Sequence, residues 1–296
     1  MVLNLKNIFL LLRPHQWLKN LFIFLPLFFD KHLTDYTYIL PTILVFCAFC
    51  SVASGIYCFN DVYDADADKL HATKKNRPIA SGVISKKLGL FISALCIIIG
   101  YLFILLFIQN NKFQIYFIIT IYLVINILYC VKLKNFALVD VFIIAIGFVL
   151  RVLIGGLTTS IWLSQWIVLM TFLLALFLAF AKRRDDVVIY EGKGLKLRKN
   201  INRYNIQFIN QAITIVATIT MVSYIMYTVS DEVVYRFNTS YLYMTSIFVL
   251  AGIIRYLQIT IVDLKSGSPT SILLKDHFIH ICIFCWIVAF LIIIYF

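Results

Sequence analysis

Acidic and amide side chains gather in the segment FNDVYDADADKLHATKKNRPIASG, residues 59–82, which follows a long apolar stretch. Four of them recur at helical intervals: Asn60, Asp61, Asp64 and Asp68. Offsets of three, four and seven residues share one helical face, so these four would lie together if the preceding helix continued, whereas Asp66 would point elsewhere. Like charges on one face repel and need a counter-charge. Because a hard divalent cation binds such oxygen ligands, often together with substrate phosphates, we expect these residues to hold Mg²⁺.

Basic side chains follow the acids in the same segment. Lys74, Lys75 and Arg77 supply the donors that bind phosphate oxygens. A metal site beside a phosphate-binding cluster suits a phosphorylated substrate. The alternative is that the charges only solvate a surface loop, as most charge runs do. His71 lies between acids and bases, and we expect it to be a hydrogen-bonding scaffold rather than a base.

A second charged segment is AKRRDDVVIYEGKGLKLRKNINRY, residues 181–204, in which lysines and arginines outnumber acids. These cations could simply anchor the chain at the cytoplasmic face of a membrane. They could also bind an anionic substrate there, at the same face as Asp61. Lys182, Arg183 and Tyr204 are the candidates for substrate binding in this segment.

Two polar sites interrupt apolar stretches. Lys19 and Asn20 occur in RPHQWLKN, and Arg151 occurs in GFVLRVLIGG. Ionisable groups inside a membrane are costly and usually face a partner or a cavity. Lys19 is therefore a candidate ligand for a substrate phosphate. For Arg151, a structural ion pair and a role in a cavity both fit the sequence.

The elements that must position these residues are membrane helices. The chain is 62% hydrophobic and 14% charged, with a mean hydropathy of +0.94, whereas soluble domains are about 25% charged. Windows long enough to cross a bilayer predict an all-α protein with nine spans: 16–34, 38–59, 88–108, 113–131, 137–156, 164–181, 207–229, 240–262 and 277–296. No linker divides them, so residues 1–296 are expected to form one transmembrane domain.

The basic residues predict the orientation of these spans, because lysine and arginine favour the cytoplasmic side. With the N-terminus inside, only Lys31, Lys112 and Arg236 fall outside, and the polar loops 60–87 and 182–206 both face the cytoplasm. The net charge of +12 is then explained by topology and anionic ligands. Nucleic acid is a poor partner, because the sequence contains no soluble basic domain.

The segment NDVYDADADKLHATKKNRPIASG resembles the N-D-x-x-D-x-x-x-D motif, with trailing Lys and R-P, of the UbiA superfamily of intramembrane prenyltransferases. Four further segments are similar to its decaprenyl-phosphate phosphoribosyltransferase branch: RPHQWLKNLFIFLPLFF, GFVLRVLIGG, AKRR and SGSPTSILLKD. The resemblance departs at Ala72, where members often have proline, and at Asp186, where they often have glutamate. It implies a UbiA-type helical bundle in the inner membrane, with its active site facing the cytoplasm.

The resemblance also implies an activity: transfer of 5-phosphoribose from phosphoribosyl pyrophosphate (PRPP) to a polyprenyl phosphate, with Mg²⁺ and release of pyrophosphate. Asp61, Asp64 and Asp68 would be the catalytic residues, holding the metal on the departing diphosphate. The implied substrate-binding residues are Lys19, Asn60, Lys74, Arg77, Lys182, Arg183 and Tyr204. The polyprenyl tail would lie in an apolar groove open to membrane lipid.

Two other functions compete with this one. A UbiA-type prenyltransferase would join a prenyl diphosphate to an aromatic or other acceptor, but such enzymes typically carry a second aspartate-rich motif where this chain has Lys182, Arg183 and Arg184. A transporter or lipid-binding protein would need a polar path across the bilayer. The ionisable residues instead gather at the cytoplasmic ends of the spans.

Overall fold

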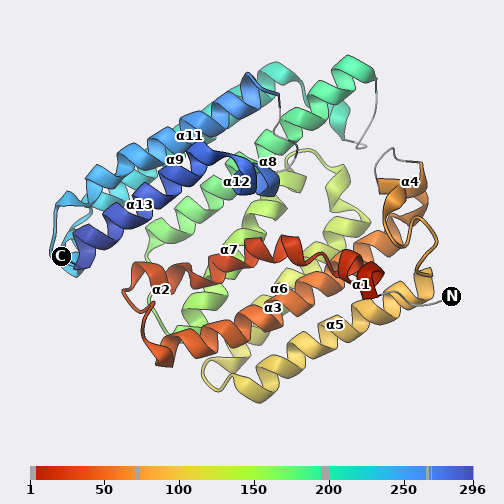
Figure 1. Ribbon diagram of the computed structural model, residues 1–296, viewed down its shortest axis with the longest axis horizontal. Coiled ribbons are helices and arrows are strands. Elements are labelled where there is room, and N and C mark those ends of the chain that lie inside the picture. The colour runs from red at the N-terminus through yellow and green to blue at the C-terminus, as the bar shows by residue number, and fades with distance from the viewer. Residues whose placement is uncertain (1–4, 71–73, 195–199, 265–266, 268, 296) are drawn as a thin grey trace. The chain divides into compact units, whose positions relative to one another are not determined.

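The structure is a computed structural model that describes residues 5–70, 74–194, 200–264, 267 and 269–295, and every regular element in these ranges is a helix (Figure 1). The all-α prediction is therefore confirmed for this part of the chain. The residues form two compact units, one of 1–134 and 146–163, the other of 135–145 and 164–296.

Ten helices begin before residue 160 in the part of the chain that the structure describes. They are α1 (Leu5–Leu12), the 3₁₀ helix η1 (Pro14–Phe24), α2 (Leu25–Phe29), α3 (Tyr36–Tyr63), α4 (Ala65–Lys69), the 3₁₀ turn η2 (Lys74–Asn76), α5 (Lys86–Phe107), α6 (Lys112–Val131), the 3₁₀ turn η3 (Leu133–Asn135) and α7 (Val139–Thr159). Helix α7 begins in the second unit, and from Ile146 onward its residues belong to the first.

The remaining elements all belong to the second unit. They are α8 (Gln165–Lys193), the 3₁₀ turn η4 (Ile201–Arg203), α9 (Ile206–Val229), α10 (Asp231–Phe237), the 3₁₀ turn η5 (Tyr241–Thr245), α11 (Ser246–Ile261), α12 (Pro269–Lys275) and α13 (His277–Tyr295). Residues 182–193, predicted as the start of a loop, continue α8.

Several of the long helices begin after a residue whose side chain caps the helix N-terminus. Ser85, Ser164 and Asn205 precede α5, α8 and α9, and each side chain accepts a hydrogen bond from a backbone N–H in the first turn. Serine and asparagine are favoured at this position because they satisfy a donor that the helix itself cannot.

Eight helices among the described residues are long and apolar enough to cross a membrane, and they coincide with the last eight of the predicted windows. The first predicted window, 16–34, is not a long helix. It consists of η1 and α2, followed by the turn that leads into α3.

The segment from Arg13 to Phe24 nevertheless runs antiparallel to α3. Four contacts define this register: Arg13 with Asp61, Trp17 with Ser54, Asn20 with Cys50 and Phe24 with Phe46. A 3₁₀ helix rises about 2.0 Å per residue, so the 11 residues of η1 and the 5 of α2 together cover about 30 Å. That length matches the hydrocarbon core of a bilayer.

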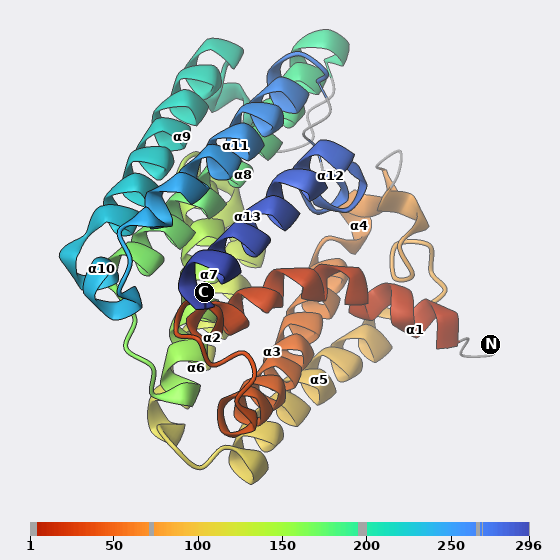
Figure 2. The same cartoon turned by 60° about the vertical axis from the view of Figure 1, so that its left-hand side comes forward.

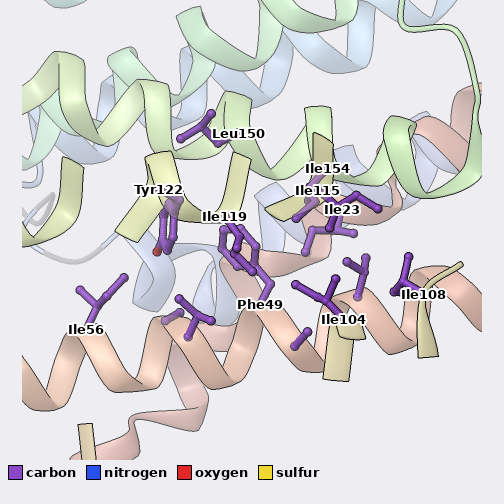
Figure 3. Packing of buried hydrophobic residues seen from close by; sticks show 14 residues of the cluster. Ile23, Phe49, Ile56, Ile104, Ile108, Ile115, Ile119, Tyr122, Leu150 and Ile154 are labelled. Carbon is purple, nitrogen blue, oxygen red and sulfur yellow. The ribbon is translucent and has the colours of Figure 1, made fainter. Parts of the chain in front are cut away.

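The core of the first unit is apolar and holds α3 at its centre. Figure 3 shows Phe49 and Ile56 of α3 packed among Ile104, Tyr122 and Ile154, which come from α5, α6 and α7. Burial of these side chains fixes the helix whose far end carries Asp61.

Helices α3 and α5 lie side by side (Figure 1) at a distance that only small residues allow. A Cβ on Gly100 would lie 2.5 Å from Val52 and 2.8 Å from the carbonyl oxygen of Ala48. Ser93 of α5 donates a hydrogen bond to the carbonyl of Gly55 at 2.7 Å. Small residues that let helix backbones approach closely are typical of membrane helix pairs.

In the second unit, α8 packs against α9, and α11 packs against both α9 and α13 (Figure 2). Polar side chains connect these helices. Arg184 of α8 donates to Asn210 of α9 and to the carbonyl of Thr260 of α11, each at 2.7 Å. Trp286 of α13 donates to the hydroxyl of Tyr224 of α9 at 2.7 Å.

Candidate active site

The predicted metal-binding residues lie where α3 ends and α4 begins. Helix α3 includes Asn60 and Asp61, Asp64 lies at the junction, and Asp68 lies in α4. The backbone N–H of Asp64 donates to Asn60 at 2.9 Å, and that of Asp68 donates to Asp64 at 2.8 Å. Because these bonds keep the four-residue spacing across the junction, the side chains of Asp61 and Asp68 come together.

Arg77 joins these two carboxylates. Its Nη1 lies 3.1 Å from Oδ1 of Asp61 and 2.6 Å from Oδ2 of Asp68, both of which are buried. The sequence predicted Arg77 as a phosphate ligand, and the structure places it between two predicted metal ligands.

Two cations that the sequence analysis did not assign complete the cluster. Arg13, between α1 and η1, pairs with Oδ1 of Asp61. Lys134, in η3, lies 2.5 Å from Oδ1 of Asp64, and its ammonium is 5.3 Å from the centroid of the Tyr63 ring. Each of the three predicted catalytic aspartates therefore has a cationic partner.

Asp66 points away from this cluster, as predicted. It is exposed and accepts hydrogen bonds from Lys86 at 2.6 Å and from Lys69 at 3.2 Å. These hydrogen bonds lower the pKa of Asp66. The residue offers a matched control for substitutions of the other aspartates, because it has the same chemistry in the same segment.

The donor chemistry of the cluster suits a hard divalent cation, because it consists of carboxylates with an amide nearby. One oxygen, Oδ2 of Asp61, is buried and has no hydrogen-bond partner among the described residues. Within those residues, no three His, Cys, Asp or Glu side chains gather closely enough to hold a metal ion together. Instead, Arg77 lies between Asp61 and Asp68.

Lys19 and Asn20 lie in η1, alongside α3. Lys19 is half-buried, and the buried Asn20 donates to Sγ of Cys50 at 3.0 Å. Asn20 also accepts a hydrogen bond from Nε of Arg151 at 2.8 Å. The backbone segment that carries Lys19 is thus held to both α3 and α7.

Arg151 is buried and takes no part in the ion pairs found among the described residues. Besides Asn20, it donates to the carbonyl of Gly147 at 2.6 Å and to the hydroxyl of Tyr122 at 2.9 Å. Its guanidinium lies 4.9 Å from the centroids of the Phe49 and Tyr122 rings. Hydrogen bonds and aromatic rings, rather than the structural ion pair considered from the sequence, therefore hold this charge.

In the second unit, Arg183 and Tyr204 meet at Asp140, a buried residue of α7 that the sequence analysis did not assign. Nε of Arg183 donates to Asp140 at 2.5 Å, and its Nη1 donates to Asp186 at 3.0 Å. The hydroxyl of Tyr204 donates to Asp140 at 3.0 Å and accepts from the backbone N–H of Leu138 at 2.7 Å.

This network is structural in character. The side chain of Arg183 is 0% exposed, and Tyr204 is also buried. Burial raises the pKa of Tyr204, and the neighbouring Asp140 carboxylate raises it further, so the hydroxyl keeps its proton and donates. Substrate binding by Arg183 and Tyr204 stays a prediction, whereas stabilising the fold is what their contacts support.

Lys74 and Lys182 are half-buried in η2 and α8, and their roles as substrate ligands stay predictions. His71 and Ala72 lie outside the described residues. The signal that would have identified Lys134 was weak, because a lysine beyond an apolar helix ordinarily suggests only membrane anchoring.

The fold and this cluster define a class of protein: a multi-pass helical membrane protein with a carboxylate and guanidinium cluster at one end of a long helix. The profile of the UbiA prenyltransferase family matches residues 23–282. The chain belongs to this family, whose members are transferases.

Several known proteins are similar to this chain. The decaprenyl-phosphate phosphoribosyltransferase of Mycolicibacterium smegmatis is 31% identical over 285 residues, covering 93% of this chain and 88% of that protein. The digeranylgeranylglyceryl phosphate synthase of Sulfurisphaera tokodaii is 27% identical, covering 76% of this chain and 77% of that protein. A UbiA homologue from Archaeoglobus fulgidus, solved with GPP and Mg²⁺, has the same fold, with a TM-score of 0.69 and 18% identity. The match covers 98% of this chain and 100% of that chain.

Proposed function

We propose that this protein transfers 5-phosphoribose from PRPP to a polyprenyl phosphate and releases pyrophosphate. The observation that carries the proposal is the similarity, over 93% of the chain, to a decaprenyl-phosphate phosphoribosyltransferase. The cluster around Asp61 supports it, because carboxylates suit a divalent cation and guanidinium groups suit the phosphates that accompany it.

The donor would bind at the junction of α3 and α4. Asp61, Asp64 and Asp68, with Asn60, would hold Mg²⁺. Oδ2 of Asp61, which is buried and has no hydrogen-bond partner among the described residues, would be one of its ligands. When bound there, such a cation neutralises the charge that develops on a departing diphosphate. Arg77, already at this position, and Lys74 would bind the donor phosphates.

The acceptor needs little activation. A phosphate monoester loses its second proton near pH 6, so its oxygen is already a nucleophile at neutral pH and requires no strong base. The bond from ribose C1 to the diphosphate breaks, the bond from C1 to the acceptor oxygen forms, and attack from the opposite face inverts C1. Lys19 and Lys182 stay our candidates for the lipid phosphate or the ribose 5-phosphate.

We place this chemistry at the cytoplasmic face of the inner membrane. The end of α3 that carries Asp61 is followed by Lys69, Lys75 and Lys86, and basic residues favour the cytoplasmic side. PRPP is highly charged and would reach the site from the water on that side.

A second candidate is prenyl transfer, in which a prenyl diphosphate takes the place of PRPP. Two observations favour it: the solved Archaeoglobus homologue is bound to GPP, and a digeranylgeranylglyceryl phosphate synthase is among the relatives. The same aspartates would serve either donor, because both donors present a diphosphate.

Two labelled donors distinguish these functions. Membranes containing the protein are incubated with Mg²⁺ and polyprenyl phosphate, once with PRPP labelled in the ribose and once with a labelled prenyl diphosphate and an aromatic acceptor. We expect label in the lipid fraction from PRPP alone. Incorporation from the prenyl diphosphate, with none from PRPP, would contradict the proposal and favour the second candidate.

A further inference from the structure

Arg13 is a residue of the site to which neither the motif nor the proposed chemistry gives a role. It follows α1, and its backbone N–H donates to the carbonyl of Phe9 at 3.2 Å. Its φ of 53° and ψ of 57° place it in the left-handed region, which is uncommon for a residue with a side chain. Such strained positions persist where the surroundings determine them, and they cluster at functional sites.

From this backbone position, the side chain of Arg13 reaches Asp61, one of the proposed metal ligands. Nη2 of Arg13 and Nη1 of Arg77 both donate to the same oxygen, Oδ1 of Asp61, while Oδ2 has no partner among the described residues. The guanidinium of Arg13 also lies 5.5 Å from the centroid of the Tyr57 ring. Its side chain is 18% exposed, so most of it is buried at the site and the rest is accessible from outside the protein.

Two guanidinium groups on one carboxylate conflict with a divalent cation on the same carboxylate. A metal ion at Asp61 would face the positive charges of Arg13 and Arg77 at close range, with little solvent to screen them. A diphosphate removes the conflict, because guanidinium groups bind phosphate oxygens through paired hydrogen bonds. Arg13 is placed so that its guanidinium can change hydrogen-bond acceptor, from the Asp61 carboxylate to a phosphate.

We propose that Arg13 is a further binding residue for the donor diphosphate. Until the donor binds, Arg13 stays hydrogen-bonded to Asp61 and keeps the metal from binding this carboxylate. This inference rests on the metal and diphosphate site of the proposed function. It holds for any diphosphate donor, because it concerns only the diphosphate.

The exchange makes metal and diphosphate binding cooperative. While Arg13 and Arg77 neutralise the carboxylates, metal alone binds weakly. When diphosphate is present, the guanidinium groups turn to it and the carboxylates become available to the metal. Because such coupling is reciprocal, the metal strengthens diphosphate binding by the same factor. A residue that merely clamps the fold would have no such effect on either ligand.

Removing the charge of Arg13 therefore changes two binding constants in opposite directions. The full-length protein is purified in detergent as wild type and as Arg13→Gln. Binding of Mn²⁺ alone is followed by electron paramagnetic resonance, and binding of radiolabelled pyrophosphate is measured at saturating Mn²⁺. We expect Arg13→Gln to bind Mn²⁺ alone about tenfold more tightly and pyrophosphate about tenfold more weakly.

Lys86→Gln is the matched control, because it removes one cation from a carboxylate, Asp66, that points away from the site. It is expected to leave both constants unchanged. If Arg13→Gln does not elute as a folded protein, Arg13→Lys replaces it. Lysine keeps the positive charge but lacks the paired N–H donors of a guanidinium. We therefore expect this variant to bind Mn²⁺ as the wild type does and to bind pyrophosphate more weakly.

Changes of the same sign in both constants, or no change in either, would overturn the role of Arg13. A protein that shows the opposed changes but does not use PRPP contradicts the proposed function and leaves this inference intact. A wild type that binds no Mn²⁺, with or without pyrophosphate, contradicts both.

Discussion

At the scale of single residues, the site is a set of carboxylates that the chain has already neutralised with its own cations. Asp61, Asp64 and Asp68 each pair with an arginine or a lysine, so the fold itself neutralises these carboxylates. Unpaired carboxylates in a buried site would be costly. The same cations are suited to phosphate, which agrees with the diphosphate binding that we propose here.

Sequence spacing predicted only the local part of this cluster. Asp61, Asp68 and Arg77 fall within one segment, so helical periodicity was enough to bring the two carboxylates together. Arg13 and Lys134 reach their partners across 48 and 70 residues, respectively. Such pairs depend on how helices pack, and charge patterning along one segment does not reveal that.

The buried network around Asp140 leads to a stability prediction at this scale. Asp140→Asn removes the carboxylate that accepts from Nε of the buried Arg183 and leaves Asp186 as the carboxylate partner of its Nη1. Loss of a buried hydrogen bond between charged groups costs about 2 kcal/mol. Thermal unfolding of the purified protein in detergent measures this loss. Asp66→Asn removes an exposed carboxylate and is expected to change the stability little, because solvent screens its ion pairs. Equal stabilities of the two variants would show that the Asp140 network does not stabilise the fold.

At the scale of elements, helix α3 is the part that positions the site, and close packing against α5 holds it. The sequence predicted both helices but not how closely they approach each other. A glycine such as Gly55 or Gly100 is as compatible with a flexible helix as with a close helix–helix contact. For helix α8, the sequence predicted too short a helix. Its last residues are charged and were predicted as loop, yet the helix continues because Arg183 and Arg184 are paired inside the second unit.

Gly100→Ala tests this packing. The added methyl group would meet Val52 and the backbone of α3, and overpacking of this kind costs about 1–3 kcal/mol. Gly192→Ala is the control, because nothing lies within 4 Å of its Cβ position, and alanine there is expected to stabilise α8 by up to about 1 kcal/mol. Both are measured by thermal unfolding. A Gly100→Ala protein as stable as Gly192→Ala would contradict the close approach of α3 and α5.

At the scale of the whole molecule, the number of membrane crossings depends on residues 13–29. Hydropathy predicted a first span here, whereas the structure has a 3₁₀ helix and one short α-helix. Periodicity could not predict this, because 3₁₀ helices of this length are uncommon and share the apolar composition of a span. The antiparallel contacts with α3 favour a ninth crossing, made by a segment that is not a long helix.

Reporter fusions test this topology. We expect the N-terminus in the cytoplasm, residues 30–35 outside and the C-terminus outside. A phosphatase that is active only outside is fused after residue 33 or at the C-terminus, and a protein that fluoresces only inside is fused to the N-terminus. A fusion after residue 200 is the cytoplasmic control. Finding the N-terminus and residue 33 on the same side would show that residues 13–29 do not cross.

We propose above all that the aspartates at the end of α3 serve the transfer of phosphoribose to a lipid phosphate. The most direct test of this role is product formation from PRPP and polyprenyl phosphate, followed by mass spectrometry, in the wild type, Asp61→Asn and Asp66→Asn. We predict that Asp61→Asn lowers the rate by at least about 10²-fold, as loss of a group that stabilises developing charge does, while Asp66→Asn stays near wild type. A phosphoribosylated lipid formed at the wild-type rate by Asp61→Asn would contradict this role of the aspartates.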